Sequence, residues 1–213
     1  MSLITLTDPG SQQSEAYRTL RTNLSFYSLD KPVQSIVVTS PTPDSEVAQT
    51  AANLAVTMAQ GGKKTVLIEA DLRRPSINQL FSVDQEPGLT NALIAADGKI
   101  PLQDSGTENL RILTGGQKAP NPADLLGSGA IQQLLEKLLN ENDMLIFNAP
   151  PINAVSDASV LGSRLDGALL VINSGTTNRD QATQAKETLA KANVRIIGAT
   201  LINADTEAGF GDY

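Results

Sequence analysis

Six short apolar runs, rich in β-branched residues, recur along the chain and limit the folds that it can adopt. Most of these runs are apolar at successive positions rather than alternate ones, which suits a strand that is buried on both faces, as in a parallel sheet. Helix-like stretches at 46–60, 129–140 and 178–192 separate most of these runs. The runs lie at 35–40, 65–69, 110–113, 144–147, 168–172 and 194–197. This alternation predicts an α/β fold with a mostly parallel sheet, helices on both faces and right-handed crossovers.

Missing residue types exclude several kinds of chemistry. The chain has 213 residues and contains neither histidine nor cysteine. It therefore has no Ser-His-Asp triad, no thiolate metal site and no disulfide framework. Any catalysis would have to use carboxylates, lysine, arginine, backbone amides or a bound metal. The length fits one domain, and no composition shift marks a second one within residues 1–213.

The charge balance and the length of the apolar runs limit the partners. Sixteen basic against 23 acidic residues give a net charge of −7, and aromatic residues make up only 3% of the chain. These values argue against a nucleic-acid partner, which needs a basic surface and, for single strands, stacking aromatic rings. No apolar stretch approaches the roughly 18 residues that span a bilayer, and the start of the chain lacks a signal-peptide pattern. We expect a cytoplasmic protein that does not insert into a membrane.

Residues 10–28 predict an amphipathic helix that lies outside the strand–helix alternation. Glu15 and Arg18 lie opposite its apolar stripe, and Arg21 lies at the margin. The stripe consists of Tyr17, Leu20, Leu24 and Tyr27. Composition alone favours a solvated charged face with one i,i+3 ion pair.

The segment after the first predicted strand occupies the place where α/β folds usually bind a ligand, between a strand end and a helix N-terminus. A phosphate-binding loop there needs glycines for close backbone approach, a lysine for the β- and γ-phosphates and a Ser or Thr for Mg²⁺. Residues 41–55 contain no glycine and no lysine. The motif alone therefore does not predict a nucleotide site.

Four segments give the sequence a resemblance to a known family. They are Glu-Ala-Tyr-Arg-Thr-Leu-Arg at 15–21, Glu-Ala-Asp-Leu-Arg-Arg-Pro at 69–75, Pro-Asn-Pro-Ala-Asp-Leu-Leu at 120–126 and Phe-Asn-Ala-Pro-Pro at 147–151. In this order and spacing they resemble the bacterial tyrosine kinases of capsule and exopolysaccharide export (BY-kinases), which are relatives of the MinD and ParA ATPases. The resemblance covers residues 10–205 and implies a P-loop NTPase-like three-layer sandwich.

The resemblance places the family's phosphate loop at six residues that lack its chemistry. They are Asp44, Ser45, Glu46, Val47, Ala48 and Gln49. Asp44 and Glu46 stand at the glycine positions and Val47 at that of the phosphate-binding lysine. Ala48 replaces the serine that binds Mg²⁺. Because phosphoryl transfer depends on charge neutralisation, these replacements predict very weak binding of a triphosphate. We expect the carboxylates of this loop to cap the following helix and to take the place of phosphates.

The resemblance also identifies three positions around the metal. Glu69 replaces the first aspartate of the second Walker motif, Asn148 replaces the Walker B aspartate, and Asp71 is retained. Asp71 is therefore the one candidate catalytic carboxylate, and the alternative is a strand-end aspartate satisfied by backbone amides. Asn203 lies where related ATPases place an adenine-contacting asparagine. It is interpreted either as a vestige of that contact or as a turn residue.

Two further expectations concern assembly. In the family the E-x-x-R-x-x-R helix is associated with ring-like self-association, so the resemblance implies an oligomer interface at Glu15, Arg18 and Arg21. Active members end in a cluster of tyrosines that are phosphorylated in trans. This chain ends in Tyr213 alone, which is either a phosphosite or part of a flexible tail at 206–213.

The favoured interpretation is a nucleotide-binding-impaired pseudokinase that binds no cofactor and acts as a scaffold or regulator of polysaccharide export. Its expected partners are further copies of itself, an active BY-kinase and the cytoplasmic part of a membrane polysaccharide co-polymerase. Such a partner would hold the chain at the inner face of the plasma membrane. The first alternative is a working tyrosine autokinase that binds Mg-ATP at an atypical site. The second is a MinD- or ParA-like positioning ATPase, which is less favoured because no amphipathic membrane-targeting tail is visible.

Overall fold

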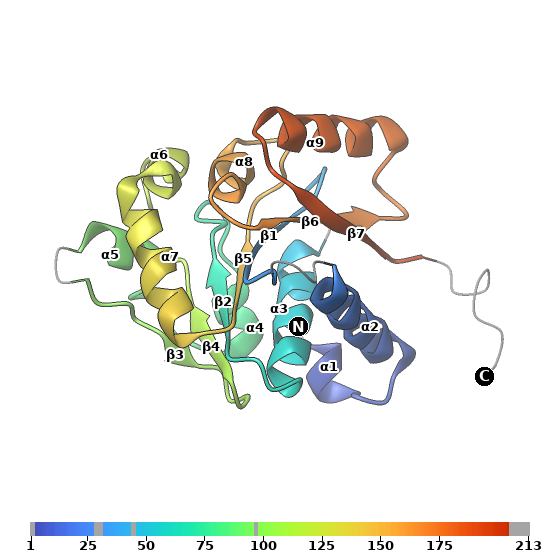
Figure 1. Cartoon of the computed structure of the whole chain (residues 1–213), viewed down its shortest axis with the longest axis horizontal. Coiled ribbons are helices and arrows are strands. Elements are labelled where there is room, and N and C mark those ends of the chain that lie inside the picture. Colours follow the sequence, from blue (N-terminus) through green and yellow to red (C-terminus); the bar gives the residue numbers. More distant parts are fainter. Residues whose placement is uncertain (1–2, 28–31, 44–45, 96–97, 205–213) are drawn as a thin grey trace.

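The computed structural model describes residues 3–27, 32–43, 46–95 and 98–204, and the strands in these ranges form one seven-stranded sheet. The strand order is β3-β4-β2-β5-β1-β6-β7, and every pairing is parallel except that of β3 with β4. The strands are β1 (Ser35–Thr39), β2 (Thr65–Glu69), β3 (Gln103–Asp104), β4 (Leu110–Leu113), β5 (Met144–Asn148), β6 (Gly167–Asn173) and β7 (Ile196–Ile202) (Figure 1). All six predicted strands are present, which confirms the mostly parallel α/β sheet.

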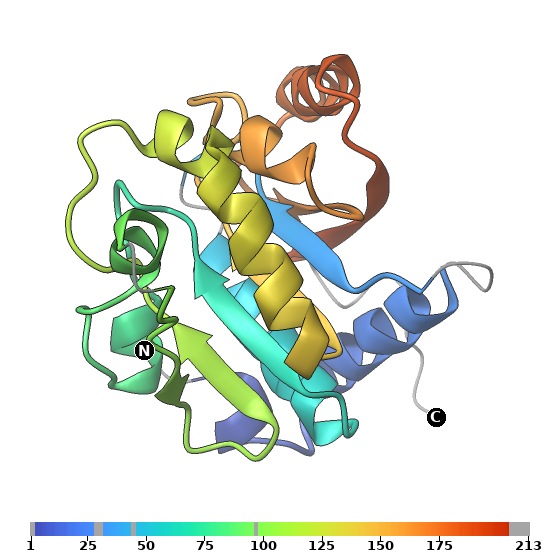
Figure 2. The ribbon, with the colours of Figure 1, turned by 60° about the vertical axis from the view of Figure 1, so that its left-hand side comes forward.

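Helices cover both faces of this sheet (Figure 1). One face carries α1 (Ile4–Thr7), α2 (Gln12–Phe26), α3 (Val47–Gln60) and α4 (Ile77–Phe81). The other carries α5 (Leu89–Ile94), α6 (Pro122–Gly127), α7 (Gly129–Glu141), α8 (Asp157–Gly162) and α9 (Arg179–Lys191). Figure 2 shows α7 lying along the front of the sheet. This arrangement confirms the predicted three-layer sandwich.

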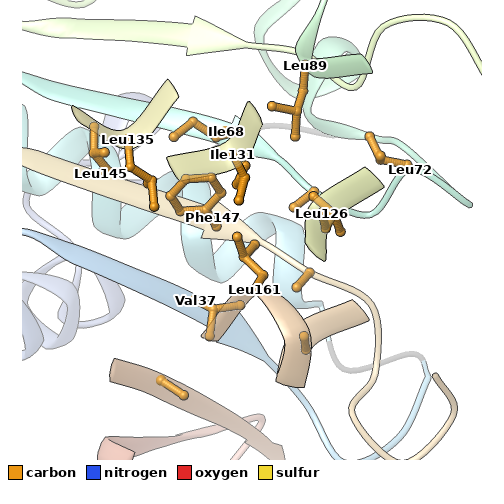
Figure 3. Packing of buried hydrophobic residues seen from close by; sticks show 14 of the residues in the cluster. Val37, Ile68, Leu72, Leu89, Leu126, Ile131, Leu135, Leu145, Phe147 and Leu161 are labelled. Carbon is orange, nitrogen blue, oxygen red and sulfur yellow. The ribbon is translucent and has the colours of Figure 1, made fainter. Parts of the chain in front are cut away.

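The sheet is buried on both faces because successive side chains of a strand point into opposite apolar layers. In β5, Phe147 belongs to the layer beneath α7, where Ile131 and Leu135 lie close to its ring (Figure 3). Its neighbour Ile146 belongs to the opposite layer together with Leu54 of α3. Phe147 and Ile146 are both fully buried. Burial on both faces explains why each central strand is apolar at successive positions.

Several elements differ from the sequence prediction. Residues 117–124 are predicted to form a loop, but helix α6 begins at Pro122. Proline suits the first helical turn, because the N–H that it lacks would have no partner there. The last strand, predicted to end at residue 197, continues to Ile202. The short helices α1, α4, α5 and α8 and the short strand β3 are absent from the prediction.

The apolar stripe of α2 packs onto the rest of the molecule. Leu24 is buried, and Leu20 packs against the same core layer. The ring of Tyr27, at the end of the helix, lies 4.7 Å from the guanidinium carbon of Arg195. Ser11 begins the helix by accepting a hydrogen bond from the amide of Ser14. The predicted helix at 10–28 is therefore present as α2, with bounds Gln12–Phe26.

Phe147 offers a test of how much the layer beneath α7 stabilises the fold. We expect Phe147→Ala to lower the free energy of unfolding by about 3–5 kcal/mol, because the cavity left behind cannot collapse completely. Phe26→Ala is the matched control, since 70% of Phe26 is exposed and little apolar surface returns to water. Urea unfolding measures both variants. Equal midpoints for the two would contradict the described packing.

Candidate functional site

A cavity of about 290 Å³ lies where the carboxyl ends of β1, β2 and β5 meet the start of α3. Because these three strands are parallel neighbours, their carboxyl ends lie at one edge of the sheet, which is the usual ligand position in such folds. The lining includes Val47 and Ala48 from α3, Asp71 and Arg74 after β2, and Asn148 at the end of β5. Of the predicted phosphate-loop and metal positions, five line this cavity: Glu46, Val47, Ala48, Asp71 and Asn148.

The start of α3 has an unusual backbone. Glu46 precedes the helix with φ 47° and ψ 35°, the left-handed conformation that glycine adopts far more readily than glutamate. This is a position at which the resemblance places a glycine. The expected capping role is wrong for Glu46, because its side chain makes no capping hydrogen bond with α3. Asp44 and Ser45 lie outside the described residues.

Glu69 is the most connected side chain at this edge of the sheet. It is fully buried at the end of β2. Its Oε2 accepts hydrogen bonds from the amides of Ser76 (2.8 Å) and Ile77 (3.0 Å). Its Oε1 accepts from the amide of Asp71 (3.1 Å) and from Nδ2 of Asn148 (2.7 Å). One carboxylate therefore fixes the turn that follows β2 and joins it to β5.

The environment of Glu69 changes its acidity in two opposing ways. Burial raises the pKa of Glu69 to about 7, because desolvation penalises the charged form. Hydrogen bonds from Ser76, Ile77 and Asn148 lower the pKa and offset part of this effect, while the charge of Asp71 adds to the rise. The carboxyl group is therefore close to its titration midpoint near neutral pH.

Asn148 faces Glu69 directly across the pairing of β2 with β5. It is buried, and its amide group supplies the hydrogen that a second carboxylate could not supply. The Asn148 Oδ1 atom accepts no hydrogen bond from the described residues. The amide at this position thus joins the two strand ends, and its buried Oδ1 has no donor among the described residues.

Asp71 stabilises the turn after β2. Its Oδ1 accepts hydrogen bonds from the amides of Arg73 (3.1 Å) and Arg74 (2.9 Å). The alternative interpretation of Asp71, a strand-end carboxylate bound by backbone amides, agrees with this geometry. Its Oδ2 accepts no hydrogen bond within the described residues, and Asp71 lines the cavity. One oxygen is therefore used by the fold and the other is available to a ligand.

The two arginines after Asp71 differ in their surroundings. Arg73 binds the fully buried Asp157 of α8 through Nε (2.8 Å) and Nη2 (3.0 Å). This bidentate contact is the main cause that raises the pKa of Arg73. Arg74 is exposed and lines the cavity, and no ion pair of its side chain occurs among the described residues. Arg74 is thus the cation that faces the cavity.

The charged residues predicted for an oligomer interface lie on α2, away from the cavity lining. Arg18 pairs with Glu15 at 2.6 Å and also donates to the carbonyl of Pro9. Arg21 donates from Nη1 to the carbonyl oxygen of Thr57 (2.9 Å), in the last turn of α3. The same carbonyl oxygen also accepts from the amide of Gly61 (3.0 Å), so the guanidinium adds a second hydrogen bond at the end of α3. Within one chain, Arg21 therefore joins α2 to α3.

Gln49 and Asn203, two further predicted positions, are not among the residues that line the cavity. Asn203 follows β7 with φ 54° and is not among the lining residues, which suits a turn residue. Tyr213 and the tail at 206–213 lie outside the described residues. Sequence reasoning missed Ser76 and the hydroxyl-bearing residues Ser40 and Thr42, which also line the cavity. Their only signal is their place directly after a predicted strand or the Arg-Arg-Pro segment.

The described ranges contain neither a candidate membrane span nor a candidate metal-binding group. No helix there has both the length and the apolarity to cross a membrane. No group of three or more acidic side chains in those ranges is arranged to hold a metal ion.

Comparison with known proteins defines the class to which this fold and cavity belong. A family model described as ParA, NUBPL iron-transfer P-loop NTPase, matches residues 34–203. The chain is therefore a member of the ParA-like P-loop NTPases.

Individual proteins that resemble the chain assign it to a narrower family within this class. Tyrosine-protein kinase YwqD of Bacillus subtilis (strain 168) is 43% identical over 201 residues, which cover 94% of this chain and 85% of that relative. The kinase domain of Escherichia coli tyrosine kinase ETK matches with a TM-score of 0.91 and 32% identity, over 100% of this chain and 84% of that domain. The chimerical protein CapA2B2 matches with a TM-score of 0.88 and 33% identity, over 93% of this chain and 88% of that protein. This chain belongs to the bacterial tyrosine-protein kinase family.

The titration of Glu69 predicts a pH-dependent contribution to stability. The folded pKa, about 7, lies above the ordinary value of 4.5, so the native state holds this proton more tightly than the unfolded chain. The contribution is complete below about pH 4.5 and is lost as the pH rises through about 7. We expect Glu69→Gln to abolish this loss, measured as urea unfolding at about pH 5 and about pH 8.

The control for this prediction is Glu108→Gln, because Glu108 is exposed. Its stability should depend on pH as that of the natural chain does. An unchanged pH dependence in Glu69→Gln would show that this carboxyl group does not titrate in the stated range.

Proposed function

We propose that this chain is a pseudokinase of its family, impaired in nucleotide binding, which acts as a scaffold or regulator in capsule or exopolysaccharide biosynthesis. The observation that carries the proposal is the lining of the cavity. Val47 offers an apolar side chain where a phosphate needs a cation, and Glu46 adds a carboxylate beside it. Two like charges about 4 Å apart repel by roughly 4 kcal/mol at an effective dielectric near 20, about a thousandfold in affinity.

The residues around the cavity do not fit Mg-ATP. Ala48 has no hydroxyl for the metal, and Asn148 offers a neutral amide in place of a carboxylate. Both oxygens of Glu69 already accept two hydrogen bonds each, so metal binding there would remove contacts that hold the turn. These features support a chain that takes no nucleotide cofactor.

A scaffold role agrees with the way the chain satisfies its own charges. The Arg73–Asp157 pair and the Glu69 network hold the strand ends together with protein groups alone. The family resemblance supplies the proposed setting: further copies of this chain, an active BY-kinase, or the cytoplasmic part of a membrane polysaccharide co-polymerase. Through such a partner the chain would lie at the inner face of the plasma membrane.

The second candidate function is an active tyrosine autokinase with an atypical site. The observation in its favour is the cavity itself, which is open to solvent beside the remaining oxygen of Asp71. In this alternative, Asp71 would act on the attacking hydroxyl and Mg-ATP would occupy the cavity. Nucleotide binding and phosphotyrosine formation distinguish the two functions.

Isothermal titration with Mg-ATP tests the proposed impairment. We expect no micromolar binding to the natural chain and no signal from an anti-phosphotyrosine antibody after incubation with Mg-ATP. The matched variant combines Asp44→Gly, Glu46→Gly, Val47→Lys and Ala48→Ser. It removes the repelling carboxylates and restores the cation, so we expect it to bind about a thousandfold more tightly than the natural chain. Micromolar binding with autophosphorylation by the natural chain would establish the second function instead.

Sedimentation velocity tests the proposed assembly surface on α2. If Glu15 and Arg18 face a neighbouring copy, Arg18→Glu should shift the profile toward smaller species, because a cation that meets a partner carboxylate becomes an acid. The exchange Glu15→Arg with Arg18→Glu is the control, since it keeps the internal i,i+3 pair but reverses the charges offered to a partner. An unchanged profile in both variants would leave this face as a solvated surface.

A further inference from the structure

Asn148, one of the residues that line the cavity, contains a buried acceptor atom that the described residues do not use. Only 3% of Asn148 is exposed, and its Nδ2 donates to Glu69 at 2.7 Å. This hydrogen bond fixes the orientation of the amide, so Oδ1 is the group left over. Oδ1 is buried and accepts no hydrogen bond from the described residues. A buried carbonyl oxygen without a donor is unfavourable, and a ligand with an N–H group would relieve that cost.

The charges around this acceptor favour a cation. Asp71 contributes Oδ2, since Oδ1 is already bound by two backbone amides. Glu46 also lines the cavity, and its carboxylate accepts no hydrogen bond from the described residues. The exposed Arg74 is the positively charged residue in the lining that offsets these two acids. Arg73 is paired with Asp157 and does not offset them. The lining therefore carries a surplus of negative charge.

We infer that this cavity binds a guanidinium group. Asn148 ends β5, and Asp71 lies two residues beyond the end of the neighbouring strand β2, whose backbone runs about 4.8 Å from that of β5. A guanidinium offers five N–H donors in a planar fork, so it can donate to acceptors on both strand ends at once. An ammonium group is a compact point charge and lacks this spread. The volume of about 290 Å³ also leaves room for the aliphatic part of an arginine side chain.

This inference rests on the proposed loss of nucleotide binding, because both concern one cavity. An anionic ligand would meet the amides at the start of α3 but also the carboxylates of Glu46 and Asp71. A guanidinium instead neutralises the surplus charge and supplies the hydrogen that Asn148 Oδ1 lacks. Its source is either a free small molecule or an arginine side chain of a protein, and the chemistry at the cavity is the same.

The inference is tested by NMR titration of the natural chain, labelled with ¹⁵N, with arginine amide and with citrulline amide. Citrulline has nearly the same shape as arginine, but it carries a neutral urea group. We expect arginine amide to shift the amide signals of Ser76, Ala149 and other cavity residues, and citrulline amide to leave them unchanged. No shift at these residues with arginine amide, or equal shifts with both compounds, would overturn the inference.

Asp71→Asn is the sharpest variant, because its carbonyl oxygen can still accept from the amides of Arg73 and Arg74. It replaces the free carboxylate oxygen with a donor, so we expect about tenfold weaker binding of arginine amide. The control Glu108→Gln removes an exposed acid that does not line the cavity, and binding should stay unchanged. Equal affinity in the natural chain and Asp71→Asn would contradict the assigned contact.

Two further titrations are needed. One distinguishes a free compound from a protein side chain as the source of the guanidinium group, and the other tests the proposed loss of nucleotide binding separately. A Gly-Arg-Gly peptide that binds more tightly than arginine amide would identify a protein side chain as the source, and equal binding would identify a free compound. Both results support a guanidinium site. Mg-ATP is titrated separately, and its binding would overturn the proposed loss of nucleotide binding. The guanidinium site is tested only by the titrations with arginine amide and citrulline amide.

Discussion

The buried carboxylate of Glu69 determines the shape of the whole edge of the sheet that carries the cavity. Four hydrogen bonds reach it from the turn after β2 and from β5. Because Ser76 and Ile77 donate to the same oxygen, the chain turns back at the end of β2 and presents Asp71 and Arg74 to the cavity. An apolar residue at position 69 would leave the backbone amides of Asp71, Ser76 and Ile77 without this acceptor, which is unfavourable above all at the buried Ile77.

The amide of Asn148 supplies a donor to Glu69 from within the protein. A carboxylate at position 148 would stand within hydrogen-bonding distance of Glu69, and two such groups must share a proton or a cation. The amide donates instead, so the two strand ends are joined by a bond within the protein. Glutamate at 69 and asparagine at 148 are therefore matched to each other.

Much of the fold follows from the sequence, because apolar runs and helical periodicity depend on local residues. All six predicted strands are present, and the strand-end positions of Asp71 and Asn148 placed them at one cavity. The features that the sequence did not predict depend on tertiary structure. The capping role expected for Glu46 is wrong because capping side chains act from an extended backbone, whereas Glu46 has φ 47°. The contact between Arg21 and Thr57 joins residues distant in sequence, and no local pattern reveals it.

Some polar groups are hydrogen-bonded within the chain, and others near the cavity have acceptor atoms without a donor in the described part of the chain. Arg73, Arg21 and both oxygens of Glu69 are engaged within the chain. One oxygen of Asp71 and the side-chain Oδ1 of Asn148 accept no hydrogen bond from the described residues. Both unused atoms are acceptors, and they lie where relatives of this fold receive ligands. A phosphate offers these atoms no donor and brings added negative charge, whereas the guanidinium group inferred above would supply both N–H donors and positive charge.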